Sequence, residues 1–254
     1  MPIQLVGILN ITSDSFSDAG LYLSPKNALD HAKKLFSAGA SILDVGAEST
    51  RPGATSLTPD EEWERLEPVI GQLVNSYPGR ISLDTFHPET VARVIKAAGP
   101  VIVNDVTGFN NPHMIKMIAD NKLRCIVSHL PTQFGQDVQA AHQNPKLIDS
   151  TQTVVDDLLK RRNQMILAGI KAEDIILDPG IGFGKTSALN MQLLEFAKFV
   201  PGHDVMIGYS KKRFLGENRM NLEVNLEAGK KAIEAGAKYL RVHDVAGHYT
   251  LTQN

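Results

Sequence analysis

Short apolar runs alternate with longer amphipathic segments along nearly the whole chain. The apolar runs are rich in Ile, Val and Leu and carry few polar residues, which is typical of buried strands in a parallel sheet. They occupy residues 3–9, 41–45, 80–83, 101–103, 124–127, 175–177, 205–207 and 239–242. The pattern therefore predicts eight strands that alternate with helices.

Between the strands, apolar residues recur at helical spacing, and prolines or glycines mark many of the segment ends. Helices are expected at 25–39, 59–77, 87–99, 112–121, 146–168, from the turn after Asp178 to about residue 200, and at 222–235. Residues 131–143 are expected to form a loop. Because only ten residues follow Tyr239–Asp244, the last helix is expected to be short or missing.

Eight βα units in a chain of 254 residues predict a (β/α)8 TIM barrel. A doubly wound parallel sheet is the structural alternative. No low-complexity linker divides the chain, so a single domain over residues 1–254 is expected.

Polar residues follow most of the predicted strands, where a barrel would bring them to one face. The inferred cavity contains Asn10, Asp84, Asn104, Asp178, Lys212, Arg241 and His243. Two carboxylates beside an amide and a lysine could bind a flat heterocycle rich in N–H groups. Arg51, Arg241 and His243 would supply positive charge for an anionic group. Asp44 is interpreted as structural, tying down its own loop, and is left out of the site.

The stretch from Asp178 to Thr186 is rich in glycine and joins a strand to a helix. It is not a P-loop, because Pro179 occupies the position of the first required glycine. It is not a dinucleotide fingerprint either, because Lys185 stands where the third glycine is required. A plain tight turn remains the alternative to a binding loop.

Composition excludes several classes of partner. The net charge is −2 without a basic block, so nucleic acid is not expected as a partner. The chain has no apolar run long enough to span a membrane and no charged leader, so a cytoplasmic protein is expected. The single cysteine, Cys125, excludes an intramolecular disulfide and fits a reducing compartment.

The motifs together resemble those of the dihydropteroate synthases. The resemblance runs from Val6 to Asp244 and is carried, in family order, by Gly7–Asp18, Glu48–Gly53, Asp84–Thr85, Asn104–Val106, Asp178–Lys185, Ser210–Lys212 and Arg241–Asp244. It implies a pterin-binding barrel, and a transferase of folate biosynthesis that sulfonamides target. The implied reaction joins 7,8-dihydropterin-6-ylmethyl diphosphate to p-aminobenzoate and yields 7,8-dihydropteroate and diphosphate.

The resemblance also implies residue roles. Asp84, Asn104, Asp178 and Lys212 correspond to pterin contacts, and Asn10 to the protein ligand of a Mg2+ cofactor. Arg51, Arg241 and His243 correspond to diphosphate contacts, with Arg241 also against the pterin. Thr50, Pro52, Phe183, Lys212 and Arg213 correspond to the p-aminobenzoate site. Asp84, Asp178, Lys212 and Arg241 are the expected catalytic residues, and family dimers suggest a possible homodimer.

Several positions depart from the family pattern. Ser13, Ala19, Ala47 and Lys211 replace residues usual in the family, and Ser128-His129-Leu130 replaces a Met-His-Met-like stretch. His129 ends the fifth strand, and a role near the cavity is kept as the lesser alternative for it. His87 is interpreted as a surface or capping residue, and His142 as solvated surface. The role of Lys185 stays open, with pairing to a carboxylate at its turn as the plain alternative to a site role.

Two other functions stay open at this point. One is a methyltransferase that uses methyltetrahydrofolate on a related pterin-binding barrel. The other is a non-catalytic pterin-binding paralogue, which the short carboxyl end favours. The response to sulfonamides is also open, because the first loop resembles that of insensitive members and the second that of sensitive ones.

Overall fold

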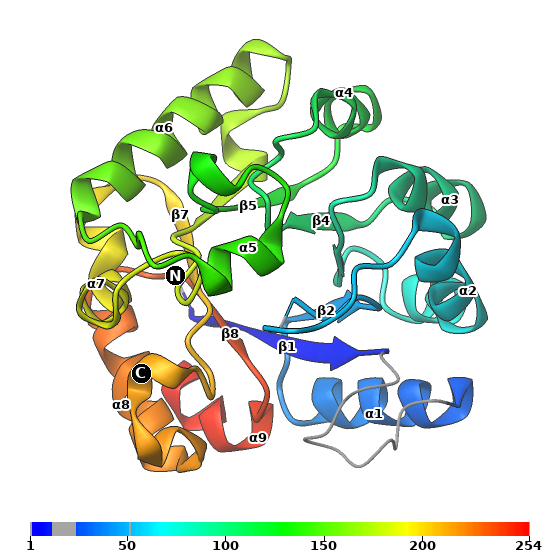
Figure 1. Cartoon of the computed structure of the whole chain (residues 1–254). Coiled ribbons are helices and arrows are strands. Elements are labelled where there is room, and N and C mark those ends of the chain that lie inside the picture. The colour runs from blue at the N-terminus through cyan, green and yellow to red at the C-terminus, as the bar shows by residue number, and fades with distance from the viewer. Residues whose placement is uncertain (1, 12–23, 51, 254) are drawn as a thin grey trace.

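The computed structural model describes residues 2–11, 24–50 and 52–253. In this part of the chain, eight strands pair in sequence order, and β8 pairs with β1 to close a barrel (Figure 1). All neighbours are parallel. The strands are β1 (Gln4–Asn10), β2 (Ile42–Gly46), β3 (Ile81–Asp84), β4 (Ile102–Asp105), β5 (Cys125–Ser128), β6 (Ile175–Asp178), β7 (Asp204–Ile207) and β8 (Tyr239–Val242). The predicted (β/α)8 barrel is confirmed, and closure excludes the doubly wound alternative.

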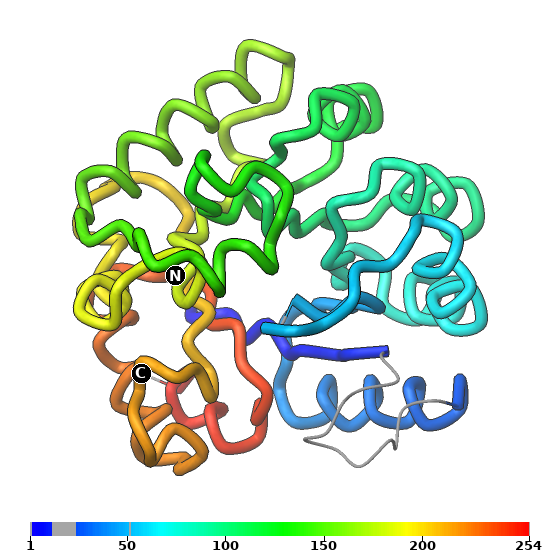
Figure 2. The backbone as a smooth tube through the Cα atoms, viewed as in Figure 1, coloured from blue at the N-terminus to red at the C-terminus, as the bar shows by residue number. Residues whose placement is uncertain are grey.

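Helices surround the strands, and Figure 2 shows the last part of the chain returning beside the first strand. The α-helices are α1 (Pro25–Ser37), α2 (Pro59–Ser76), α3 (Pro88–Ala98), α4 (Pro112–Asn121), α5 (Val138–Gln143), α6 (Thr151–Leu167), α7 (Ser187–Gln192), α8 (Leu222–Glu234) and α9 (Val245–His248). Proline begins four of them, because its missing N–H costs nothing in the first turn. Thr58 also forms a reciprocal capping box with Glu61 at the start of α2.

Two buried layers hold the barrel together. One lies inside it and consists of Val6, Ile42, Ile102, Ile126, Ile176, Met206 and Tyr239. The larger layer lies between strands and helices and includes Leu5, Leu43, Leu83, Val103 and Val127. Because side chains alternate along a strand, inward and outward apolar residues come from neighbouring positions. This explains why the strands read as continuous apolar runs.

The segment after β5 differs from the expected loop. It contains a 3-10 turn (Thr132–Phe134) and the short helix α5. The following helix, α6, begins at Thr151 rather than at residue 146. The residues before α6 are extended, because Ile148 pairs in parallel with Lys185. Its backbone N–H and carbonyl form hydrogen bonds with the residues on either side of Lys185. Ser150 then caps α6 by accepting from the Thr153 amide.

The last helix is short, as predicted. Within the described residues, α9 and a 3-10 turn (Tyr249–Thr252) follow β8. Glycines let this end pack closely: a Cβ at Gly39 would lie 2.3 Å from the Tyr249 ring, and one at Gly7 would lie 3.1 Å from Val245. The short segment therefore still covers part of the first βα unit.

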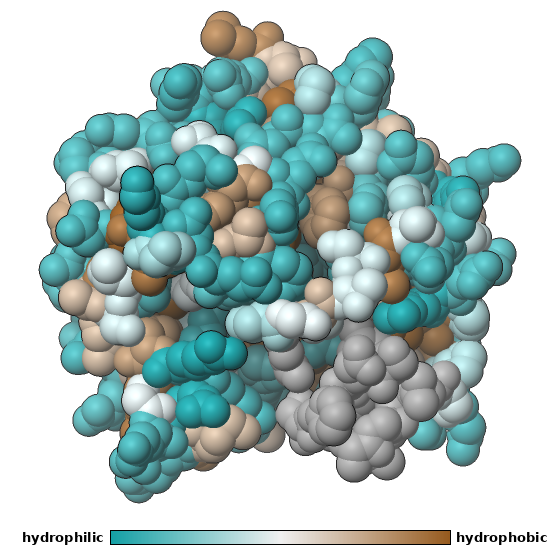
Figure 3. All heavy atoms as spheres, in the orientation of Figure 1, coloured by the Kyte–Doolittle hydropathy of each residue, from teal (hydrophilic) through white to brown (hydrophobic). Residues whose placement is uncertain are grey.

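No helix within the described ranges is both long enough and apolar enough to cross a membrane. On the face shown in Figure 3, hydrophilic side chains predominate and hydrophobic atoms appear between them in small groups.

Two helical glycines provide a matched test of packing at the carboxyl end. A Cβ at Gly229 in α8 would lie 2.4 Å from the Tyr209 hydroxyl and 2.7 Å from Leu251. A Cβ at Gly71 in α2 would meet no atom within 4 Å. We expect Gly229→Ala to lower the free energy of unfolding by about 1–3 kcal/mol through overpacking. Gly71→Ala should raise it by roughly 0.5–1 kcal/mol through helix propensity. Urea denaturation measures both, and equal effects would contradict tight packing at Gly229.

Candidate active site

A polar layer lies directly above the inner apolar layer, at the carboxyl ends of the strands. Most of its members come two residues after an inward-facing apolar residue and therefore point to the same side. The pairs are Ile42 and Asp44, Ile102 and Asn104, Ile126 and Ser128, Ile176 and Asp178, and Tyr239 and Arg241. The strand register places Asp84 beside Asn104 and Ser128 beside Asp178. The structure thus brings four sequence-predicted residues from four strands, Asp84, Asn104, Asp178 and Arg241, into one layer.

Arg241 joins three strands of this layer. Its Nε donates to Asp44 Oδ2 at 2.6 Å, and its Nη2 donates to Asp84 Oδ2 at 2.7 Å. The amide nitrogen of Asn104 also donates to Asp44 Oδ2, at 2.9 Å. Asp44 is completely buried, so the paired guanidinium compensates the cost of burying its charge. Asp44 therefore belongs to the site and does not tie down its own loop; the interpretation of Asp44 as a local structural residue was wrong.

Two oxygen atoms of the layer are buried without a hydrogen-bond partner among the described residues. They are Asp44 Oδ1 and the side-chain oxygen of Asn104. Both are acceptors, and a buried acceptor left unpaired costs free energy. The layer therefore suits a flat ligand that presents N–H groups.

Asp178 and Lys212 lie beside Gly208, close to Arg241. An ideal Cβ built on Gly208, which follows β7, would lie 3.6 Å from Asp178 Oδ2, 3.8 Å from Lys212 Nζ and 3.8 Å from Arg241 Cβ. These three side chains thus surround a space that exists because residue 208 has no side chain. Lys212 Nζ also donates to the Ile181 carbonyl at 2.5 Å.

Burial sets the pKa values in this layer. It raises the pKa of Asp84 to about 7, helped by the negative charge of Asp44 and opposed by Arg241. Burial also raises the pKa of Asp178, against the attraction of Lys212 and the Gly180 N–H. The pKa of Lys212 falls to about 8, because desolvation outweighs the nearby carboxylates. The polar layer thus combines three carboxylates with two cationic side chains. The pKa values of Asp84 and Lys212 lie near neutral pH.

The turn after β6 holds Asp178 in place. Asp178 Oδ1 accepts from the Gly180 amide at 2.7 Å. Gly180 has φ +61°, and a Cβ there would lie 2.1 Å from the His129 carbonyl oxygen, so only glycine fits. Lys185 is buried and donates to the carbonyls of His129, Gly180 and Phe183 at 3.0, 2.8 and 2.9 Å. The structure thus answers the open question about Lys185: its hydrogen-bond partners are backbone oxygens and not a carboxylate.

A side chain of α8, Asn225, holds the loop after β7 in place. Asn225 accepts from the Lys211 amide at 2.9 Å and donates to the carbonyls of Arg219 and Asn221. Lys211 adopts φ +60°, a conformation uncommon for residues other than glycine. On the same side, the backbone N–H and Nδ1 of His243 lie 3.3 and 3.1 Å from Ser210 Oγ. This contact places His243 beside the loop that carries Lys212.

The residues expected around the second substrate lie further out. Phe183 stands 5.2 Å from Lys212 Nζ and 5.2 Å from the His142 ring. The Thr50 carbonyl oxygen lies 2.9 Å from His142 Nε2. Pro52 is exposed, as is Arg213, whose charge acts on His142. Arg51 and the first-loop residues 12–18, with Ser13 and Ala19, lie outside the described residues.

Asn10 ends β1 on the same face as Val6 and pairs in register with Gly46, next to Asp84. Within the described residues, no three His, Cys, Asp or Glu side chains are grouped closely enough to hold a metal ion. One amide oxygen is nevertheless a suitable ligand for Mg2+, which usually takes most of its ligands from water and phosphate groups. The residues present therefore fit a Mg2+ that arrives with an anionic substrate.

His87 and His142 differ from expectation, whereas His129 takes the position that the sequence favoured for it. His129 is buried and its Nε2 lies 3.2 Å from Asp157, because it follows the inward Ser128 and so points away from the cavity. His142 is half-buried against Thr50 and Phe183 rather than solvated. His87 stands at the cap position of α3 without a side-chain capping bond and instead lies 3.3 Å from Glu48.

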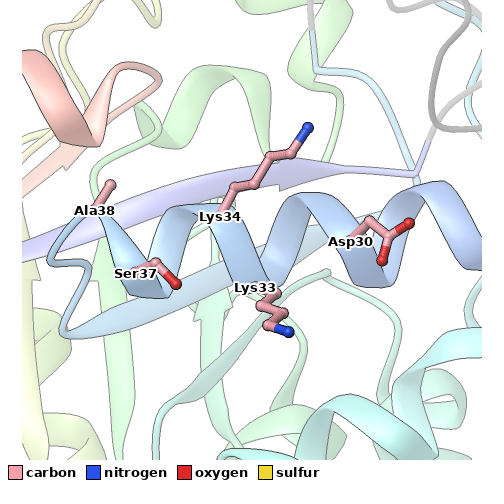
Figure 4. Close-up of a pocket in the computed structure, with 5 residues that line it drawn as sticks. All are labelled: Asp30, Lys33, Lys34, Ser37 and Ala38. Carbon is pink, nitrogen blue, oxygen red and sulfur yellow. The ribbon is translucent and has the colours of Figure 1, made fainter.

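A separate surface hollow of about 490 Å3 lies along α1. It is lined by Asp30, Lys33, Lys34, Ser37 and Ala38, and Figure 4 shows Lys33 and Lys34 pointing to opposite sides of the helix. It contains no residue of the polar layer, so it is not part of the site.

Fold and site together define a class: a (β/α)8 barrel that binds a heterocycle rich in N–H groups at its carboxyl end. A family model described as "Pterin binding enzyme" matches residues 6–243. The dihydropteroate synthase of Neisseria meningitidis serogroup C is 36% identical over 252 residues, covering 95% of this chain and 88% of its own length. The chain therefore belongs to the pterin binding enzyme family and, within it, to the dihydropteroate synthases.

Solved structures agree with this assignment. Yersinia pestis dihydropteroate synthase in a sulfonamide drug complex superposes with a TM-score of 0.89 at 30% identity, covering 99% of this chain and 92% of its own. Xanthomonas albilineans dihydropteroate synthase with 4-aminobenzoic acid gives 0.84 at 34% identity, covering 99% and 91%.

The interaction of Asp44 with Asp84 can be tested by titration. Replacing Asp44 with Asn removes a negative charge that raises the pKa of Asp84, and it leaves Arg241 free to pair with Asp84 alone. Both changes favour the ionised form, so the pKa of Asp84 should fall from about 7 by roughly one unit or more. Carbon NMR of aspartate-labelled protein, with the signal assigned through Asp84→Asn, measures this. Asp120→Asn on the surface of α4 is the control, and an unchanged or higher midpoint in Asp44→Asn would contradict the coupling.

Proposed function

We propose that this chain condenses 7,8-dihydropterin-6-ylmethyl diphosphate with p-aminobenzoate, giving 7,8-dihydropteroate and diphosphate. It is a transferase of folate biosynthesis. The observation that carries the proposal is the largely buried layer in which Arg241 joins Asp44 and Asp84 while Asp178 and Lys212 lie beside Gly208.

The pterin would lie in this layer. Its ring N–H and amino groups suit the carboxylates of Asp84 and Asp178 and the unpartnered oxygen of Asn104. Lys212 can donate to an acceptor on the ring, since its Nζ borders the space next to Asp178. Arg241, held by two carboxylates through Nε and Nη2, would use the remaining N–H groups and the face of its planar guanidinium for the ligand.

The diphosphate would lie nearer the rim. His243, Arg51 and the outer edge of Arg241 would contact it, and Asn10 would contribute one ligand to a bound Mg2+. When bound, Mg2+ supplies positive charge that stabilises the leaving diphosphate. This arrangement puts the cationic groups where negative charge develops.

The second substrate would lie between the loops after β2 and β6. Thr50, Pro52 and Phe183 would enclose its aromatic ring, and the backbone near Lys212 together with Arg213 would receive its carboxylate. Support comes from Phe183, which stands between Lys212 and His142, and from the charge of Arg213 nearby.

The reaction begins with cleavage of the bond between the pterin methylene carbon and a diphosphate oxygen. The electron pair leaves with diphosphate, so positive charge develops on the pterin methylene. Asp84 and Asp178 stabilise that charge through the ring, because preorganised carboxylates in a buried site act with little screening. The amino nitrogen of p-aminobenzoate then forms the new bond and loses a proton, so no strong protein nucleophile is required.

We also propose that residues 1–254 form a single domain, because one closed barrel supplies every described site residue. A cytoplasmic location and a homodimer stay predictions from the sequence. Sedimentation velocity at micromolar concentration would detect the dimer.

The function is tested by incubating the protein with the dihydropterin diphosphate, Mg2+ and p-aminobenzoate. We expect release of diphosphate that depends on p-aminobenzoate and stops when EDTA removes the metal. Binding of the pterin without release would instead support a non-catalytic paralogue. Methyl transfer from methyltetrahydrofolate, with no diphosphate release, would support the methyltransferase alternative.

Asp84→Asn tests the role of the carboxylate. The amide keeps the shape but removes the charge that stabilises the cation, so kcat should fall by about 100-fold or more. Circular dichroism should show an intact fold, and the exposed Asp120→Asn should retain normal turnover. Near-normal kcat in Asp84→Asn would remove this residue from the mechanism.

A further inference from the structure

The short helix α5, which replaces the expected loop, connects two loops of the site. Its Ala141 carbonyl accepts from the Gly184 amide at 3.1 Å, in the turn after β6. On its other side, Gln139 Oε1 accepts from the Gly53 amide at 3.0 Å, and His142 Nε2 lies 2.9 Å from the Thr50 carbonyl oxygen. Figure 1 shows α5 inside the ring formed by the longer helices.

The helix is itself firmly held. Asp137 caps it by accepting from the Ala140 amide at 2.9 Å. Val138 and Ala141 are buried in a separate cluster with Val106, Leu130 and Phe134. A rigid base of this kind allows α5 to fix the position of whatever it binds.

The contact of His142 has a defined chemistry. The Thr50 carbonyl can only accept, so His142 Nε2 must carry the hydrogen. The ring also packs at 5.2 Å against Phe183, tilted by 46°. Burial lowers the pKa of His142, as do the charges of Arg213 and Lys212, so the neutral ring with Nε2–H is the form present near neutral pH.

These contacts converge on the place proposed for p-aminobenzoate. Thr50 and Phe183 come from loops on different strands, and His142 touches both. The distance between those two walls therefore depends on α5. A wall that is already in place costs less entropy when the ligand binds, which raises affinity without a new ligand contact.

We propose that His142 and Gln139 are positioning residues that clamp Thr50 and Gly53 to the turn carrying Phe183, and so set the affinity for the aromatic amine substrate. This inference rests on the proposed function. Neither side chain needs to touch the reacting atoms. The clamp acts on the second substrate and leaves the buried pterin layer unchanged.

Paired substitutions separate the hydrogen bonds from simple packing. His142→Phe keeps a ring against Phe183 but loses the donor, whereas His142→Gln keeps an N–H donor. Gln139→Leu loses the acceptor, whereas Gln139→Glu keeps it. We expect His142→Phe and Gln139→Leu each to raise KM for p-aminobenzoate by about three- to ten-fold, the worth of one hydrogen bond. KM for the pterin diphosphate and kcat should stay within about two-fold, and the Gln and Glu variants should restore most of the affinity.

Gln143→Ala is the matched control, because Gln143 is exposed on the same helix and should leave all constants unchanged. Unchanged KM for p-aminobenzoate in both His142→Phe and Gln139→Leu would overturn the clamp. A loss of kcat with unchanged KM would overturn it as well, because positioning of the substrate would then not be the effect.

Hydrogen exchange tests the clamp without any turnover. The Gly53 amide should exchange faster in Gln139→Leu than in the wild type, and at the wild-type rate in Gln139→Glu. Failure of the wild type to release diphosphate would refute the proposed function and leave this readout intact. Identical exchange of Gly53 in the wild type and Gln139→Leu would refute the clamp alone.

Discussion

The site depends on one guanidinium held between two carboxylates. Arg241 bonds to Asp44 and Asp84 on different strands, and Asn104 joins the same Asp44 oxygen. A buried carboxylate without such partners would be neutral at working pH or would destabilise the fold. The pairing therefore lets the barrel keep negative charge deep in its mouth, where a ligand that gains positive charge would be stabilised.

The layering of the barrel follows from the two-residue period of a strand. Ile42, Ile102 and Ile176 fill the interior, and the next inward positions are Asp44, Asn104 and Asp178. The apolar layer closes the bottom of the cavity and keeps water away from the charges above it. Low polarity below and fixed polar groups above make each electrostatic contact stronger than it would be at the surface.

Most of the fold and the deep site could be predicted from the sequence because both rest on short-range regularities. Strand ends, and the polar residues that follow them, can be located by pattern alone. Asp44 was missed because its partner Arg241 is 197 positions away and no local pattern reveals that pairing. A signal was present, since Asp44 follows an apolar run with the same spacing as Asn104 and Asp178. The helix α5 and the contacts of His142 had no such signal, because that segment is short and its order comes from tertiary packing.

The proposed arrangement puts the pterin in the polar layer at the strand ends and the second substrate between the outer loops. This division has a chemical reason. A cation formed beside water would be captured by it, so the second substrate must be in place and water excluded when the bond breaks. Rigid strand ends suit the pterin, which has to meet fixed carboxylates. Loops suit the second substrate, which in the proposed arrangement lies further out than the pterin. A loop that stays free would admit water, and a loop that is fully fixed would block entry. Two hydrogen bonds from α5, each worth about 1 kcal/mol, lie between these extremes: they are enough to favour one position of Thr50 and Gly53 without fixing the whole loop.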